Sequence, residues 1–337
     1  MHKDCDKKVF LIGDIGGTKT NIGLFVPGKT RPRLVTMETY ASKEAGGIEE
    51  ILEHFVKRHS FTPASAVFGI AGPVIDGQAR TTNLPWLVSE TMIRNHFGWN
   101  RVALINDLTA TAMAVPFLGN NEVWPLNRVR KKRHGVIGVV ASGTGLGEAL
   151  MVYHNNQYIP VSSEGGHVDF APATEEQTSL WHYLHRKFGH VSVERVASGQ
   201  GMVNIYQWLK NTGRYHEPEW LKKDMETMDP AAVITKAALD NGSSLCRLVL
   251  DHFILTLGSV CGNLALTVMA TGGMYLGGGI PPKILPYLKK DIFMKAFTDK
   301  GRFRTFMEKI PVKVILDSRA PLIGAAIYAE KMVPQKG

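Results

Sequence analysis

Cysteine is scarce in this sequence. The 337 residues include three cysteines, Cys5, Cys246 and Cys261, which are odd in number and lie outside any metal-ligand spacing. This pattern argues against a disulfide framework and is typical of reduced thiols in a reducing compartment. We therefore expect a cytoplasmic protein.

The start of the sequence has no apolar run. The first eight residues, MHKDCDKK, hold no apolar signal core and run directly into a strand-like segment. Formal charge is absent from residues 253–282, a run that is long enough to span a bilayer. However, Asn263 and several glycines interrupt this run, and Gly272-Gly273 would break a helix. We expect a buried helix followed by a buried strand, and no membrane partner.

Aromatic residues are missing from the most basic segment. The formal net charge is +9, and Lys and Arg dominate residues 128–133. A basic face can bind nucleic acid, or it can raise the local concentration of an anionic substrate. No aromatic residue interleaves with this run, and no helix-turn-helix or zinc-finger pattern accompanies it. We interpret it as a solvated loop and expect no nucleic-acid partner.

Short apolar runs alternate with glycine-rich turns and helical spacing along the chain. Strands are predicted at residues 9–12, 21–25, 66–70, 102–105, 135–141 and 312–316. Helices are predicted at residues 47–59, after Asp107 and at 321–332. A strand followed by a glycine turn occurs near residue 10 and again near residue 140, which favours two related sheets. The fold class is therefore mixed α/β.

Three glycine clusters follow apolar strands. Residues 13–20 read GDIGGTKT, residues 142–147 read SGTGLG, and residues 277–280 read GGGI. Paired glycines let backbone N–H groups approach phosphate oxygens, and Asp14 could hold a hydrated Mg²⁺. The first cluster is neither a Walker A loop nor a dinucleotide GxGxxG motif, and each cluster alone could be only a turn. Three such loops at strand ends together predict phosphate binding.

Polar residues accompany other strand ends and loops. Asp107 follows a buried strand and could accept a hydroxyl proton during phosphoryl transfer, or it could only cap the next helix. Residues 164–169, EGGHVD, could bind sugar hydroxyls or a metal, but no Cys or second His lies nearby at ligand spacing. Glu194 alone could be an exposed helix charge. His182, His185 and His190 are interpreted as surface or packing residues.

Taken in order, these motifs resemble the bacterial-type glucokinases of the sugar kinase, Hsp70 and actin superfamily. The resemblance covers residues 11 to about 329. Its markers are GDIGGT at 13–18, GIAGPV at 69–74, TNLPW at 82–86, INDLTA at 105–110, GTGLG at 143–147, EGGHVDFAP at 164–172, ERVASG at 194–199 and LGGGI at 276–280. Their order and content together are specific.

The resemblance implies a fold and an activity. It implies two ribonuclease-H-like domains with an active-site cleft between them. The small domain would hold residues 1–117 plus 320–337, and the large domain residues 118–319. The implied activity is ATP-dependent phosphorylation of glucose to glucose 6-phosphate, which feeds glycolysis, with Mg²⁺ as cofactor and a homodimer as one possible state.

The resemblance also implies roles for single residues. Asp107 would be the catalytic base. The sugar would be bound by Asn83, Asn106, Asp107, Glu164, His167 and Glu194. The nucleotide would be bound by Gly13, Asp14, Ile15, Gly16, Gly17, Thr18, Gly143, Thr144, Gly278 and Gly279. Asp14 would hold the Mg²⁺ through water.

Other functions stay open from the sequence. The sister ROK kinases carry a cysteine-rich zinc motif after their Gly-His, and no cysteine lies between Cys5 and Cys246 here. We therefore favour the glucokinase branch over a ROK-like kinase for another hexose. A non-catalytic sugar sensor and a basic nucleic-acid-binding protein are further alternatives. The sequence does not distinguish ATP from ADP or polyphosphate as the donor.

Overall fold

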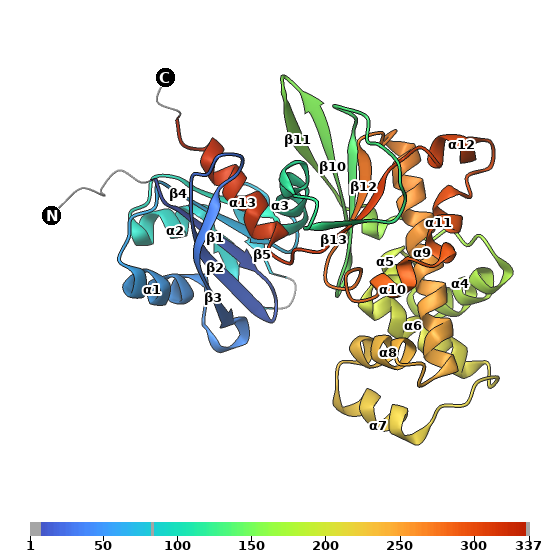
Figure 1. Cartoon of the computed structure of the whole chain (residues 1–337). Coiled ribbons are helices and arrows are strands. Elements are labelled where there is room, and N and C mark those ends of the chain that lie inside the picture. Colours follow the sequence, from blue (N-terminus) through green and yellow to red (C-terminus); the bar gives the residue numbers. More distant parts are fainter. Residues whose placement is uncertain (1–7, 82–83, 335–337) are drawn as a thin grey trace. The chain divides into compact units, whose positions relative to one another are not determined.

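The computed structural model describes residues 8–81 and 84–334 (Figure 1). The chain forms two compact units. Unit 1 comprises Met1–Gly119, His154–Ser162 and Asp317–Gly337, and unit 2 comprises Asn120–Tyr153 and Ser163–Leu316. Asn83 lies outside the described residues.

The first sheet forms the centre of unit 1. Its order is β3-β2-β1-β4-β7, in which β1, β2 and β3 are antiparallel and β4 and β7 continue parallel to β1. The bounds are β1 Phe10–Ile15, β2 Lys19–Val26, β3 Arg33–Ala41, β4 Ser65–Ile70 and β7 Val102–Asn106. Every residue of β4 is buried, as expected for a parallel strand that is covered on both faces.

Side chains of a strand alternate between the two faces of the sheet. Apolar side chains therefore point to both faces, and helices cover both. Leu11 and Ile15 of β1 pack with α1 (Ile48–His59) and α2 (Glu90–Phe97). Phe10 and Ile12 pack into a second core with α3 (Asp107–Ala114) and α13 (Ala320–Lys331). Figure 1 shows α3 and α13 side by side. Strands β5 (Gln78–Arg80) and β6 (Leu87–Ser89) form a small separate sheet.

The second sheet contains the same arrangement of strands as β1, β2 and β4 in the first sheet. Its order is β11-β10-β9-β12-β13-β8. The bounds are β8 Val123–Pro125, β9 Ile137–Ser142, β10 Leu146–His154, β11 Gln157–Ser163, β12 Gly273–Gly277 and β13 Val312–Ile315. As in the first sheet, an antiparallel hairpin with a glycine turn (β9–β10) is followed by a parallel strand beside its first member (β12). The two related sheets and the mixed α/β class expected from the sequence are confirmed.

Helix α9 (Ser244–Thr267) is the central helix of unit 2. Its most apolar window has a mean hydropathy of 1.5, and 67% of that window is buried. Among the described residues it is the one helix that is long and apolar enough to cross a membrane. A Cβ at Gly258 or at Gly262 would lie 2.5 Å from a backbone oxygen of α11 (Asp291–Thr298). These glycines therefore allow close packing of two core helices, and the charge-free run is a buried helix followed by the buried strand β12.

The other helices of unit 2 surround α9 and the sheet. They are α4 Glu175–Phe188, α5 Glu194–Ala197, α6 Gly199–Asn211, α7 Glu219–Thr227, α8 Pro230–Leu239, α10 Leu285–Leu288 and α12 Arg304–Met307. The 3₁₀ turns are η1 Ser42–Glu44 and η2 Val115–Phe117 in unit 1, and η3 Gly165–His167 and η4 Gly301–Phe303 in unit 2.

Candidate active site

Asn106 and Asp107 lie at the junction of β7 and α3. Asn106 is the N-cap of α3, because its Oδ1 accepts hydrogen bonds from the backbone N–H groups of Leu108 (3.0 Å) and Thr109 (3.1 Å). Its Nδ2 donates to Gly72 O at 3.1 Å. Asp107 is the first helical residue, and its Oδ1 accepts from Leu108 N at 2.8 Å. The helix therefore has a cap in Asn106, and Asp107 is not required for that role.

The first glycine cluster is the turn of the β1–β2 hairpin. Gly16 N donates to Lys19 O at 3.1 Å, and Thr18 is exposed. Two hydrogen bonds from Ser42, a buried residue of η1, stabilise this turn. Its Oγ donates to Gly16 O at 2.8 Å, and its N–H donates to Thr18 O at 3.0 Å. No local pattern points to Ser42, because this contact joins residues that are far apart in the chain.

Asp14 is half-buried in β1, opposite Asn21 of β2. Burial raises the pKa of the Asp14 carboxyl, and a hydrogen bond with the Asn21 side chain partly opposes that rise. The described residues contain no cluster of three or more His, Cys, Asp or Glu that could hold a metal. A lone carboxylate of this kind fits a Mg²⁺ that keeps most of its waters and binds phosphate oxygens.

The second glycine cluster is the turn of the β9–β10 hairpin, and it is fixed to α5 and α6. Gly143 O accepts from Gly199 N at 2.8 Å, at the start of α6. Glu194, the first residue of α5, accepts at its Oε2 from Leu146 N at 2.9 Å. Glu194 is half-buried and supports this loop, so it is more than an exposed helix charge. Thr144 at the tip of the turn is exposed.

The third glycine cluster packs directly on the second. Gly278 has a φ of 84°, and a Cβ there would contact Ser142 O and lie 2.8 Å from Ser142 N. Ile280 N donates to Ser142 O at 3.1 Å. Only glycine satisfies both the left-handed conformation and this close approach. Around Gly279 the space is open, since no heavy atom lies within 4 Å of a Cβ built there.

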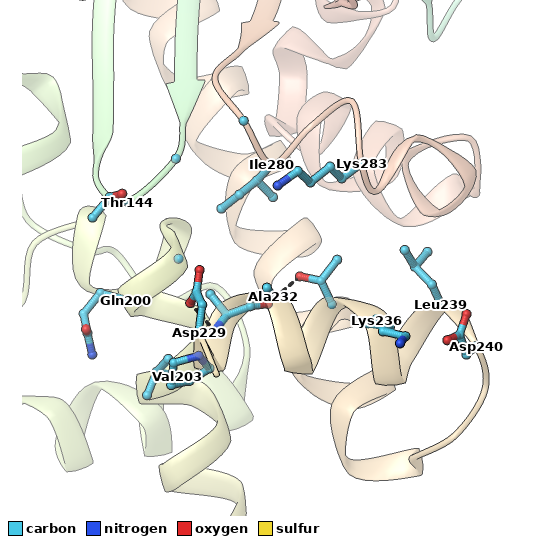
Figure 2. A pocket seen from close by; sticks show the side chains of 16 residues that line it. Thr144, Gln200, Val203, Asp229, Ala232, Lys236, Leu239, Asp240, Ile280 and Lys283 are labelled. Atoms are coloured by element: carbon cyan, nitrogen blue, oxygen red, sulfur yellow. Dashed lines mark hydrogen bonds between the residues drawn. The ribbon is translucent and has the colours of Figure 1, made fainter. Parts of the chain in front are cut away.

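These two loops form one wall of a cavity of about 740 Å³ in unit 2 (Figure 2). Thr144 and Gln200 lie toward one end, and Lys236, Leu239 and Asp240 lie toward the other. The lining residues are Gly143, Thr144, Gly199, Gln200, Val203, Asp229, Pro230, Ala231, Ala232, Thr235, Lys236, Leu239, Asp240, Gly279, Ile280 and Lys283. The volume is that of a typical small-molecule site. Of the predicted nucleotide-binding residues, the cavity brings together Gly143, Thr144 and Gly279.

Two helices begin at this cavity. Ser198 caps α6 by accepting from Gly201 N at 3.0 Å, and Asp229 caps α8 by accepting from Ala231 N at 3.0 Å. Helix N-termini favour anions because their N–H groups and dipoles point outward. Apolar atoms of Val203, Leu239 and Ile280 suit a flat ring. The α8 wall was not predicted from the sequence, because it carries no glycine motif.

Glu164 and His167 flank a buried glycine pair. They lie in the turn that follows β11, where His167 N donates to Glu164 O at 2.9 Å. Their side chains are 63% and 62% exposed, with 3.9 Å between Glu164 Oε2 and His167 Nε2. The structure therefore brings these two predicted sugar-binding side chains together in unit 2. Asn106, Asp107 and the first glycine turn belong to unit 1.

Comparisons with known proteins match nearly the whole chain to glucokinases. The family model described as Glucokinase matches residues 11–332. The chain is 37% identical to a glucokinase of Synechocystis sp. over 347 residues, covering 95% of this chain and 97% of that protein. It is 36% identical to a glucokinase of Nostoc punctiforme, covering 96% of this chain and 99% of that one.

Solved structures show the same fold. A glucokinase from an Antarctic psychrotroph superimposes with a TM-score of 0.83 at 29% identity, over 96% of this chain and 99% of that one. A Balamuthia mandrillaris glucokinase in complex with glucose gives 0.79 at 20% identity, over 96% and 94%. A ROK family glucokinase from Streptomyces griseus in complex with glucose and AMPPNP gives 0.64 at 20% identity, over 96% and 99%. The family match spans nearly the full length and the relatives exceed 30% identity, so the chain belongs to the glucokinase family.

Proposed function

We propose that this protein transfers the γ-phosphoryl group of ATP to the terminal hydroxyl of glucose and releases ADP and glucose 6-phosphate. The observation that carries the proposal is the Glucokinase match over residues 11–332. The cavity beside Gly143 and Thr144 supports it, because it combines an apolar wall with two helix N-termini. A panel of hexoses with ATP tests it, and glucose should give the highest kcat/KM. A higher kcat/KM for another hexose would favour the ROK-like alternative.

Each unit has its own part in this proposal. We infer that the two units correspond to the small and large domains that the resemblance implies, with residues 154–162 grouped in unit 1. ATP would occupy the cavity of unit 2, with its phosphates toward Thr144 and Gln200 and its base beside α8. The turn at Gly16, Gly17 and Thr18 would contribute N–H groups to the phosphates. Mg²⁺, held through water by Asp14, would neutralise charge on the phosphate oxygens.

The chemical step needs a proton acceptor. The attacking sugar oxygen forms a bond to the γ-phosphorus, and the bond from that phosphorus to the bridging oxygen of ADP breaks. The hydroxyl proton goes to the Asp107 carboxylate. Asn106 can offer the glucose one amide N–H, since its other amide N–H donates to Gly72 O and its Oδ1 is occupied by the start of α3. Glu194 would reach the sugar from the start of α5.

Glu164 and His167 are expected to bind sugar hydroxyls, and their substitution should affect glucose rather than ATP. Removing one partner of a hydrogen bond that becomes buried costs about 1–3 kcal/mol. Glu164→Gln and His167→Ala should therefore raise the KM for glucose roughly 5- to 150-fold and change the KM for ATP much less. Steady-state kinetics with each substrate varied in turn measure this. Glu226→Gln, at an exposed position on α7, is the control. An unchanged glucose KM in both site variants would remove these residues from the sugar site.

The cellular setting follows from the reaction. Because glucose 6-phosphate enters glycolysis, we place the enzyme in the cytoplasm. A homodimer stays a prediction, and analytical ultracentrifugation would test it.

A further inference from the structure

Glu148 is a buried acid that the proposed reaction does not use. It lies in β10, directly opposite Val140 of β9, and only 8% of its surface is exposed. Glutamate is among the residues that are seldom buried unless they are paired. Among the described residues, the Glu148 carboxyl has no recorded hydrogen bond or ion pair. Burial of an acid without a partner costs less free energy in the neutral form than in the ionised form.

The surroundings of this carboxyl explain its protonation. Burial alone raises the pKa of Glu148 to about 7. Burial first, and then the Glu148 charge, raise the pKa of the Cys261 thiol of α9, and the Lys300 charge partly opposes that rise. Glu164 and His167 are the titratable groups of the adjoining turn, and both side chains are mostly exposed. None of these groups is a cause of the Glu148 shift.

The carboxyl lies directly under the turn that carries Glu164 and His167. A Cβ on Gly165 would contact Glu148 Oε2 and would lie 2.7 Å from Glu148 Cδ and 3.1 Å from Ser163 Oγ. The next residue, Gly166, rests on Leu146 O of the same strand. Gly165 and Gly166 therefore lie where the turn packs too closely on β10 for a side chain to fit between them.

We propose that Glu148 is a positioning residue for glucose binding, whose neutral carboxyl supports the Gly165–His167 turn and whose ionisation displaces that turn. The inference rests on the proposed function, since it takes Glu164 and His167 as the groups that bind the sugar. Water drawn in by the charged carboxylate would lift Gly165 and Gly166, and the two side chains that flank them would lose their common geometry.

The direction of the pH dependence follows from linkage. An acid whose folded-state pKa lies above its unfolded value of about 4.5 supports the structure while it is protonated and withdraws that support as the pH rises through about 7. Glucose binding favours the ordered turn, so it favours protonated Glu148. The KM for glucose should therefore rise with pH, by up to about tenfold per unit above the pKa of the free enzyme.

The test is the glucose KM of the wild type and of Glu148→Gln from about pH 6 to about pH 9, with ATP saturating. Gln has the shape of the neutral acid and does not ionise. We expect the wild-type KM to rise on the order of tenfold across this interval, while Glu148→Gln keeps a low and nearly constant KM. The KM for ATP should show no such difference between the two proteins. Cys261→Ser, which removes the neighbouring thiol, should keep the wild-type pH profile.

Two results distinguish a failure of this inference from a failure of the proposed function. If the wild type phosphorylates glucose and Glu148→Gln shows the same KM profile, the inference is wrong and the proposed function stands. If the wild type shows no glucose-dependent turnover at any pH, the proposed function fails. In that case the pH dependence of thermal unfolding still tests the acid itself, since Glu148→Gln should remove a loss of stability that the wild type shows as the pH rises from about 4.5 to about 7.

Discussion

Replacement of Asp107 by Asn is expected to lower kcat by about 10²–10⁴-fold, the usual contribution of a positioned general base. A primary hydroxyl is a very weak acid, so the attacking oxygen must lose its proton as it approaches phosphorus. Asn has nearly the same size as Asp and can still hydrogen-bond the hydroxyl, but it cannot take the proton. Glucose should therefore still bind within about tenfold of the wild-type affinity. Single-turnover kinetics and glucose titration measure the two quantities separately.

The structure sharpens this experiment because Asn106 already caps α3. Asp107→Asn should leave the free energy of unfolding within about 1 kcal/mol of the wild type, the size of a first-turn charge effect. Asn106→Ser is the matched variant for the free energy of unfolding, since Ser is also a good N-cap residue. A near wild-type turnover rate in Asp107→Asn would show that another group accepts the proton.

The second large effect is expected at Gly324, where α13 crosses α3. A Cβ on Gly324 would contact Ala110 O and would lie 2.7 Å from Ala110 C and 3.0 Å from Ala114 N. These are backbone atoms, so the two helices would have to separate. Gly324→Ala should lower the free energy of unfolding by about 3 kcal/mol or more. Since Asp107 begins α3, kcat should fall as well.

Lys331→Ala, an exposed change at the end of the same helix, is the control for Gly324→Ala. Surface changes of this kind stay within about 0.5 kcal/mol. Chemical denaturation of the two variants measures the difference. Equal stability of Gly324→Ala and the wild type would contradict the close packing of α3 and α13.

Local patterns predicted the strands and their turns because each strand carries its own signal. Residues 9–12 and 66–70 are short apolar runs, and they became β1 and β4 of one sheet. Glycine marked the hairpin turns because a turn needs conformations that other residues resist. The same logic located Asp107 at the end of a buried strand. The repeat of strand and glycine turn also predicted the second sheet.

Contacts between distant residues could not be predicted from local patterns. Asn and Asp cap helices about equally well, and it is the extended backbone of Asn106, with φ −62° and ψ 140°, and its Oδ1 hydrogen bonds that identify it as the cap. Ser42 and Glu194 support glycine turns that lie far away in the sequence. The α8 wall of the cavity is an ordinary apolar helix in sequence. Glu148 stands in an apolar strand, where nothing local shows that Gly165 covers it.

Glucose-dependent formation of ADP by the wild-type protein is the most direct test of this account. The protein is incubated with ATP, Mg²⁺ and glucose, and ³¹P NMR follows ATP, ADP and the sugar phosphate together. We expect ADP and glucose 6-phosphate to appear in equal amounts, and ADP to stay near its starting level when glucose is left out. A folded protein that binds ATP and glucose but forms no sugar phosphate would contradict the proposed function and would favour a non-catalytic sugar sensor.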